Sequence, residues 1–259
     1  MDLQRVSRAI RRSPPLARLE AVWTVVRPPY ERLLRVRYGR RGMPLAVGGG
    51  ERIRVDPICR RYVWEEHEEA GLWAALTGEI REGDRFADIG ANIGIYTIAA
   101  ARRGARVVSF EPNPRVAGLL RRNVALNGMG DRVDVREVAL AASPGETHLA
   151  IRGTLDMGAN IDQSGGVAVR AETLSEPFDV AKIDVEGYEY EVLRGAAALL
   201  ADSTRRPRAI FIELHCALLE VRGASSSRLA VLLSGYYLTR LAAPHVGQDR
   251  EHWLARART

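Results

Sequence analysis

A strand-to-helix turn at residues 88–94, with the sequence DIGANIG, constrains the fold of this chain most strongly. It joins a short apolar run at residues 86–89 to an apolar, alanine-rich segment at residues 95–103 that is predicted to be a helix. Glycines permit a tight bend and a close approach of the backbone to a ligand, and the first amides of a helix present unpaired donors and the positive end of its dipole. The turn is therefore predicted to bind an anionic group.

The spacing of this turn separates two classes of nucleotide cofactor. The dinucleotide fingerprint GxGxxG would have its second glycine at position 92, where this chain has Asn92. The pattern therefore favours S-adenosylmethionine over NAD. A second apolar run at residues 106–110 is followed by Glu111, about 20 residues beyond the turn, where a carboxylate can accept hydrogen bonds from both ribose hydroxyls. Together these features predict a nucleoside-binding site.

From residue 85 onward the chain alternates predicted strands and helices, which indicates an α/β fold with a mainly parallel sheet covered by helices on both faces. Ala139 would lie at the carboxyl end of the third strand, near an adenine. Residues 143–175 are predicted to form a hairpin insertion that helps to form the substrate mouth. The remaining predicted strands are residues 133–138, 179–185 and 209–214, the helices are residues 114–127, 188–200 and 225–234, and residues 236–241 and 252–255 form a terminal antiparallel pair.

Residues 1–62 are predicted to be an extension that precedes the main domain at residues 63–259. Its first 41 residues hold eleven arginines and three acidic residues, a net charge of +8 in a chain whose total is +6. Short basic helices are expected there, then a hairpin around the glycines at 48–50 and a helix at residues 64–76. The basic segment is expected to cap the substrate side. The alternatives are a docked helix with a solvated face, or contact with nucleic acid or an anionic membrane surface.

Cysteine content and hydropathy bear on the compartment. Cys59 and Cys216 are too few and too far apart in sequence for a disulfide framework or a metal cluster. No apolar stretch approaches the roughly 18 residues of a membrane-spanning helix, and the first residues lack the apolar run of a signal peptide. A cytoplasmic protein without a transmembrane segment is expected. The sequence does not indicate an oligomeric state.

Two predicted strands end in ionisable residues that are candidates for catalysis. Lys182, the one lysine among 38 basic residues, alternates with Asp184 and Glu186 and so shares one side of the fourth strand with them. Glu213 and His215 share one side of the fifth strand, so the two clusters meet if these strands are neighbours. The alternative is a structural ion pair of Lys182. The other histidines lack acidic company in the pattern and are expected to be ordinary surface or core residues: His67, His148, His245 and His252.

Four motifs in this order resemble the FkbM-type methyltransferase family. They are FxDIGANIGxYT at residues 86–97, FEPNP at 110–114, KIDVEG at 182–187 and IELH at 212–215, and the resemblance covers roughly residues 83–240. It implies an S-adenosylmethionine-dependent O-methyltransferase with a Rossmann-like seven-stranded sheet. The implied acceptor is a hydroxyl group of a sugar, a glycolipid or a polyketide-type natural product.

The resemblance also implies roles for individual residues. Glu111 would hold the ribose, Asn113 and Ala139 would lie near the adenine, and cofactor and acceptor would meet at Asp184. The methionine part of the cofactor would lie along the turn and the start of its helix, at Asp88, Gly90, Asn92, Gly94, Tyr96 and Thr97. Which molecule within these classes is the acceptor is not implied, because the extension and the insertion are where members would differ in substrate.

Methyl transfer to oxygen requires the acceptor to be aligned and its hydroxyl proton to be removed. His215 or Asp184 could take that proton. Alternatively, a divalent cation held by Asp184, Glu186, Glu213 and His215 could lower the pKa of the hydroxyl. The sequence leaves both possibilities open.

Two rival functions remain at this stage. A nucleic-acid-directed methyltransferase or binding protein would use the arginine-rich segment to grip phosphate, although a nucleic-acid partner is not expected. A nicotinamide-dependent dehydrogenase is disfavoured by Asn92.

Overall fold

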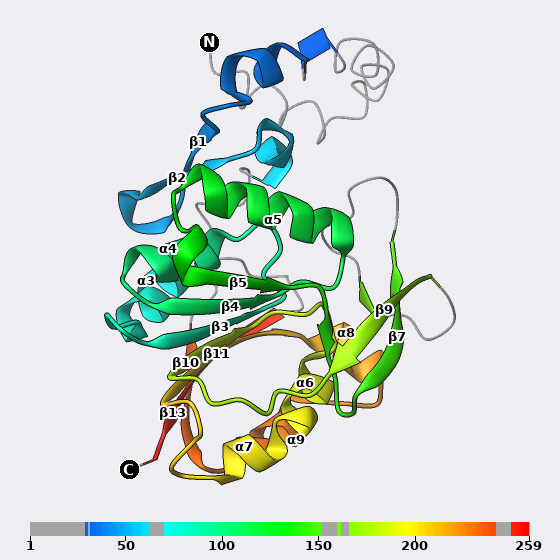
Figure 1. The fold of residues 1–259 in the computed structure, drawn as a ribbon. Coiled ribbons are helices and arrows are strands. Elements are labelled where there is room, and N and C mark those ends of the chain that lie inside the picture. Colours follow the sequence, from blue (N-terminus) through cyan, green and yellow to red (C-terminus); the bar gives the residue numbers. More distant parts are fainter. Residues whose placement is uncertain are drawn as a thin grey trace, which may run out of the picture.

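The structure is a computed structural model that describes residues 29–30, 32–62, 70–151, 160–161, 166–241 and 250–258. Its centre is a seven-stranded sheet with the strand order β12-β13-β11-β10-β3-β4-β5 (Figure 1). This arrangement confirms the predicted Rossmann-like sheet. The strands are β3 (Arg85–Ile89), β4 (Arg106–Phe110), β5 (Val133–Arg136), β10 (Val180–Ile183), β11 (Ala209–His215), β12 (Tyr236–Leu241) and β13 (Arg250–Ala257).

The strands at the centre of this sheet are parallel, from β11 through β10, β3 and β4 to β5. Every residue of β10 and β11 is buried, as is every residue of β3 and β4 after the first, which agrees with their nearly continuous apolar sequences. β13 is inserted between β11 and β12 and runs antiparallel to both. The predicted terminal antiparallel pair is therefore confirmed.

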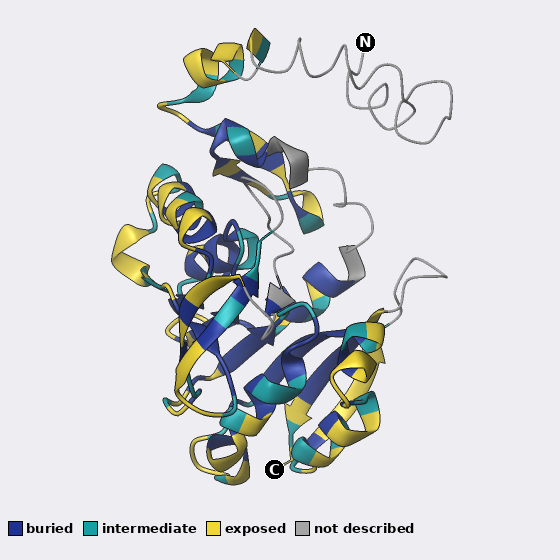
Figure 2. Ribbon diagram, turned by 90° about the vertical axis from the view of Figure 1, so that its right-hand side faces the viewer, coloured by how far each residue is buried: buried dark blue, intermediate teal, exposed yellow. Residues whose placement is uncertain are grey.

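Helices cover both faces of the sheet (Figure 1). α3, α4 and α5 lie on one face, and α6, α7 and α9 lie on the other, where Val192, Leu199 and Leu229 join the core beneath β10 and β11. Figure 2 shows the central strands as buried and the outward faces of the helices as exposed. The helices are α3 (Ala70–Glu79), α4 (Ile95–Arg102), α5 (Pro114–Leu126), α6 (Glu189–Gly195), α7 (Ala197–Ala201), α8 (Cys216–Val221) and α9 (Ser226–Leu232).

None of the helices in the described part of the chain is long and apolar enough to cross a membrane.

The predicted hairpin before the sheet is formed by β1 (Met43–Ala46) and β2 (Arg52–Val55), joined through the 3-10 turn Gly48–Gly50. Its residues Leu45 and Ile53 share a buried cluster with Ile98 and Leu120. The hairpin thus packs on α4 and α5. The domain boundary at residue 62 stays a prediction.

The described part of the basic segment includes a helical stretch at residues 32–38. Arg40, Arg41, Arg54 and Arg122 line a hollow near Leu126, at the end of α5. Leu126 lies about 20 Å along α5 from Asn113, at the rise of roughly 1.5 Å per residue of an α-helix. The predicted capping role of residues 1–41 stays a prediction, since residues 1–28 and 31 lie outside the described residues.

The insertion is larger than the predicted hairpin. It forms a second sheet of order β6-β9-β7-β8, in which β7 and β9 are the predicted antiparallel pair. β5 ends at Arg136, two residues before the predicted end, so Ala139 begins β6 in this second sheet instead of ending a strand of the first. The strands are β6 (Ala139–Leu140), β7 (Gly145–Ala150), β8 (Asn160–Ile161) and β9 (Val167–Glu172).

Two predicted helices differ in their bounds. The helix expected at residues 188–200 is divided at Ala196, where a backbone of φ −90° and ψ −1° ends α6. α3 is described from Ala70 and continues to Glu79, three residues beyond the predicted end. Residues 64–69 of the predicted helix lie outside the described residues.

Candidate active site

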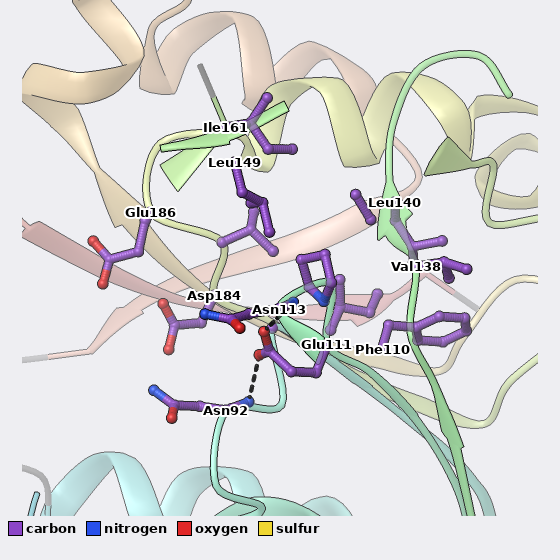
Figure 3. Close-up of a pocket in the computed structure, with 15 residues that line it drawn as sticks. Asn92, Phe110, Glu111, Asn113, Val138, Leu140, Leu149, Ile161, Asp184 and Glu186 are labelled. Carbon is purple, nitrogen blue, oxygen red and sulfur yellow. Dashed lines mark hydrogen bonds between the residues drawn. The ribbon is translucent and has the colours of Figure 1, made fainter. Parts of the chain in front are cut away.

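A pocket opens at the carboxyl ends of β3, β4 and β10, beside the second sheet (Figure 3). Its polar part is made by Asn92, Glu111, Asn113, Asp184 and Glu186. Its apolar part is lined by side chains from β4, the segment after β5 and the second sheet: Phe110, Val138, Ala139, Leu140, Leu149 and Ile161. An apolar wall opposite convergent polar groups is the usual form of a small-molecule site.

Gly90 allows two turns to touch beneath this pocket. Its φ of +76° is left-handed, and a Cβ at this position would overlap the carbonyl oxygen of Asp184. The Gly90 and Ala91 amides also donate to the carbonyl of Phe110, at 3.0 and 3.1 Å. The turn after β3 therefore rests directly on the backbone after β10, which only glycine permits.

Buried charges support the turn from below. Asp88 is wholly buried, and its Oδ2 accepts a hydrogen bond of 2.6 Å from Thr97. Lys182 Nζ lies 3.8 Å from Asp88 Oδ1 and 3.1 Å from Asp184 Oδ2, and it donates to the Gly90 carbonyl at 3.3 Å. Burial raises the pKa of Asp88. Burial opposes the charge on Lys182, but the carboxylates of Asp184 and Asp88 raise its pKa overall, so it stays protonated.

The Glu111 carboxylate is held by two backbone amides. Asn92 N donates to its Oε2 at 3.0 Å, and Asn113 N donates to its Oε1 at 2.9 Å (Figure 3). Burial raises the pKa of Glu111 to about 7, against the lowering effect of these amides. Each carboxylate oxygen has a second lone pair, so the group can still accept two further hydrogen bonds from a ligand.

His215 lies at the end of β11 among carboxylates. Its side chain is 5% exposed, and its Nδ1 lies 2.8 Å from Glu189 Oε1. Its Nε2 is 3.2 Å from Glu186 Oε2 and 3.8 Å from Glu213 Oε1. Burial lowers the pKa of His215, but the hydrogen bond to Glu189 and the neighbouring carboxylates, including Asp184, outweigh it and raise the pKa to about 9.

The model of the FkbM methyltransferase domain matches residues 88–222, just over half of the chain. The chain belongs to the FkbM methyltransferase family. This membership confirms the predicted family and enzyme class.

Two named relatives are similar to parts of this chain. The hexuronic acid methyltransferase AglP of Haloferax volcanii is 29% identical over 150 residues, which cover 54% of this chain and 59% of AglP. The ribosomal protein L11 methyltransferase of Pelobacter propionicus is 36% identical over 86 residues, which cover 30% of this chain and 28% of that protein. This chain therefore spans less than two thirds of the length of either relative.

A solved structure shares the fold. The ribosomal protein L11 methylase of Lactobacillus delbrueckii subsp. bulgaricus aligns with a TM-score of 0.50 at 13% identity, covering 81% of this chain and 86% of that one. At this identity the likeness concerns the fold alone.

The FkbM domain brings six of the predicted cofactor residues to the pocket wall: Gly90, Asn92, Glu111, Asn113, Ala139 and Asp184. The other four, Asp88, Gly94, Tyr96 and Thr97, do not line the pocket. The Tyr96 ring lies against Lys182, whose Nζ is 5.3 Å from the ring centroid, and Gly94 is the N-cap residue of α4. Asp88 thus lies in β3, Gly94 in the turn after it, and Tyr96 and Thr97 in α4.

The predicted catalytic residues converge as expected, but for a different reason. Of the three that were expected to alternate on one strand, only Lys182 lies in β10, which ends at Ile183. Asp184 and Glu186 belong to the turn that follows, in which Glu186 has a left-handed φ of 51°. The turn, and not the alternation of a strand, directs both carboxylates to the pocket.

Sequence reasoning missed Glu189, the first residue of α6. This residue is wholly buried and accepts from the Gly187 amide at 3.0 Å as well as contacting His215. An acidic residue in the first turn of a helix ordinarily complements the helix dipole, so the pattern did not distinguish it.

The expectation for His252 was wrong. It lies directly opposite Glu213 in the β11–β13 ladder, with its Nε2 3.5 Å from Glu213 Oε2. Arg250 binds the same carboxylate at 2.7 Å. Burial raises the pKa of Glu213, but the contacts with His252 and Arg250 outweigh it and hold the pKa below its usual range. His67 and His245 lie outside the described residues.

Proposed function

We propose that this chain transfers a methyl group from S-adenosylmethionine to a hydroxyl group of a sugar, alone or as part of a glycolipid or a polyketide-type natural product. The single observation that carries the proposal is the cluster of Asp184, Glu186 and His215 at the polar end of the pocket. The likeness to AglP, named a hexuronic acid methyltransferase, supports a sugar acceptor.

The donor set of the pocket suits this cofactor. The apolar wall, with Phe110 and Leu149 among its members, suits a planar base, and Glu111 can accept hydrogen bonds from the two ribose hydroxyls. Asn92 and Asp184 provide polar groups for the amino-acid end. When bound, S-adenosylmethionine supplies a methyl group activated by a sulfonium.

The acidic cluster favours a hydroxyl acceptor over a carboxylate. A carboxylate is already ionised at neutral pH and needs no proton acceptor, whereas a hydroxyl must lose its proton as the new bond forms. Asp184 and Glu186 line the pocket and can accept that proton. His215, which lies beside Glu186, is held by Glu189 and keeps the carboxylate in position.

The experiment is incubation with methyl-labelled S-adenosylmethionine and separate acceptor pools of uronic-acid glycans, neutral glycans, lipid extracts and RNA. The expected product is a methylated glycan whose label resists mild alkali, as an ether does. An alkali-labile methyl ester would contradict the hydroxyl assignment. Label in RNA, together with RNA binding that weakens steeply with salt, would instead support the nucleic-acid alternative.

A further inference from the structure

We infer that Asp184, Glu186 and His215 bind a divalent metal cation at the polar end of the pocket. Each offers one ligand atom, and these atoms lie within 4.8 Å of one another. The binding site is inferred from geometry and charge alone. The role of the ion in the reaction rests on the proposed function.

The separations suit a cation. Nitrogen and oxygen ligands lie roughly 2.0–2.2 Å from ions such as Zn²⁺ and Mg²⁺, so neighbouring ligands of a tetrahedral or octahedral ion are about 3.0–3.5 Å apart. His215 Nε2 and Glu186 Oε2 are 3.2 Å apart. Asp184 has a second oxygen to offer, because its Oδ2 is the atom that Lys182 binds.

The orientation of His215 is an independent observation that points to an ion. Its Nδ1 is within hydrogen-bond distance of Glu189, and its Nε2 faces the carboxylates of Glu186 and Glu213. Nε2 is buried and makes no hydrogen bond with any residue in the described ranges. Carboxylates gathered around a buried ring nitrogen need a positive charge between them, which a proton on Nε2 or a metal ion in its place supplies. A carboxylate that orients a histidine in this way is common behind metal ligands.

The charge balance around the cluster also favours a cation. In the portion of the chain that the structure describes, neither Glu186 nor Glu189 has a Lys or Arg within ion-pair distance. Lys182 and Arg250 make their short contacts with other carboxylates. The buried Glu189 and the half-buried Glu186 thus share His215 as their ion-pair partner. Two carboxylates beside one imidazole leave an excess of negative charge in the cluster.

The donor set narrows the choice of ion. Two carboxylates and one imidazole suit Mn²⁺, Fe²⁺ and Zn²⁺, since imidazole is a poor ligand for Mg²⁺ and Ca²⁺. Three protein ligands leave positions open on the side of Asp184 and Glu186 that faces the pocket. An acceptor hydroxyl bound at such a position would have a lowered pKa and would release its proton to a free carboxylate oxygen.

The test is a titration of the full-length, chelator-treated chain with Mn²⁺, in which binding is measured as the loss of the electron paramagnetic resonance signal of free Mn²⁺. A parallel titration with Zn²⁺ is measured by calorimetry. The chain should bind one equivalent of at least one of these two ions. Glu186→Gln, His215→Gln and Asp184→Asn should each weaken binding at least tenfold. Glu146→Gln, which changes an exposed carboxylate of β7, should bind as the wild type does.

A cooperative thermal unfolding transition shows which variants are folded, and three separate ligand variants protect the test against one that is not. No stoichiometric binding of either ion, or equal binding by the wild type and all folded ligand variants, would overturn the inference. Intact ion binding without any methyl transfer would count against the proposed function and leave the metal site standing. Methyl transfer that survives complete removal of the ion would overturn its catalytic role.

Discussion

Replacing Glu111 with glutamine tests how the fold holds this carboxyl group. Burial raises its pKa from 4.5 to about 7, so the folded chain favours the protonated form. Such a group contributes its full stability below pH 4.5, and that contribution is lost as the pH rises to 7. At 1.36 kcal/mol per pKa unit, the loss is about 3 kcal/mol. Glu111→Gln has the same shape but cannot ionise, so it escapes this loss.

The assay is urea unfolding of the wild type and Glu111→Gln at several values between pH 4.5 and 8. The difference between their unfolding free energies should shift by about 3 kcal/mol in favour of the variant across this window. Glutamine can accept only one of the two backbone amides, but that penalty of about 1–3 kcal/mol does not vary with pH and drops out of the comparison. Glu146→Gln, at an exposed position, serves as the control.

Parallel pH profiles for the wild type and Glu111→Gln would refute the reasoning, because they would mean that Glu111 has the same pKa in the folded and unfolded chain. The ribose role is tested in the same samples. Hydroxyl donors favour the charged carboxylate, so S-adenosylmethionine should stabilise the wild type and should stabilise the variant much less. Equal stabilisation would separate Glu111 from the cofactor.

Three further changes probe the neighbouring groups. Gly90→Ala should lower the free energy of unfolding in urea by about 3 kcal/mol or more and abolish cofactor binding. Gly50→Ala, at the same φ of 76° but with open space around it, should lower that free energy by only about 1 kcal/mol. Similar losses in the two variants would refute the clash at Gly90. His215→Ala should lower turnover roughly 100-fold with cofactor affinity within a few-fold, and unchanged turnover would remove His215 from the reaction. The raised pKa of His215 gives stability that is full below pH 6.5 and lost as the pH rises through about 9. Glu189→Gln removes a main cause of that pKa, so it should flatten the fall between pH 6.5 and 9 in unfolding experiments, and an unaltered fall would contradict this.

The elements of the main sheet could be predicted because each follows from local patterns. β4 and α5 were predicted almost to the residue, since an apolar run, the cap at Asn113 and the proline that follows it are all adjacent in sequence. The end of β10 could not be read in the same way. The alternation of Lys182, Asp184 and Glu186 is typical of a strand, but β10 ends at Ile183. The next residue, Asp184, turns with its carbonyl against Gly90, a contact between residues 94 positions apart in sequence.

The partners of the candidate catalytic groups were the least predictable part of the site. His215 was identified because acidic residues stand near it on its own strand and on the neighbouring one. Its shortest contact, to Glu189, comes from a helix on one face of the sheet. His252 meets Glu213 only because β13 returns beside β11 in a particular register, and a shift of one residue would turn His252 to the other face.

The insertion of β13 between β11 and β12 also fixes an order of events during synthesis. β12 is made before β13, so when it leaves the ribosome it has no strand to pair with, and the edge of β11 is still uncovered. An uncovered apolar edge readily pairs with other chains. A nascent chain that stops before residue 250 would expose this edge and would lack Arg250 and His252, the partners of Glu213. Completion of the sheet and of this side of the candidate site therefore waits for the same eight residues.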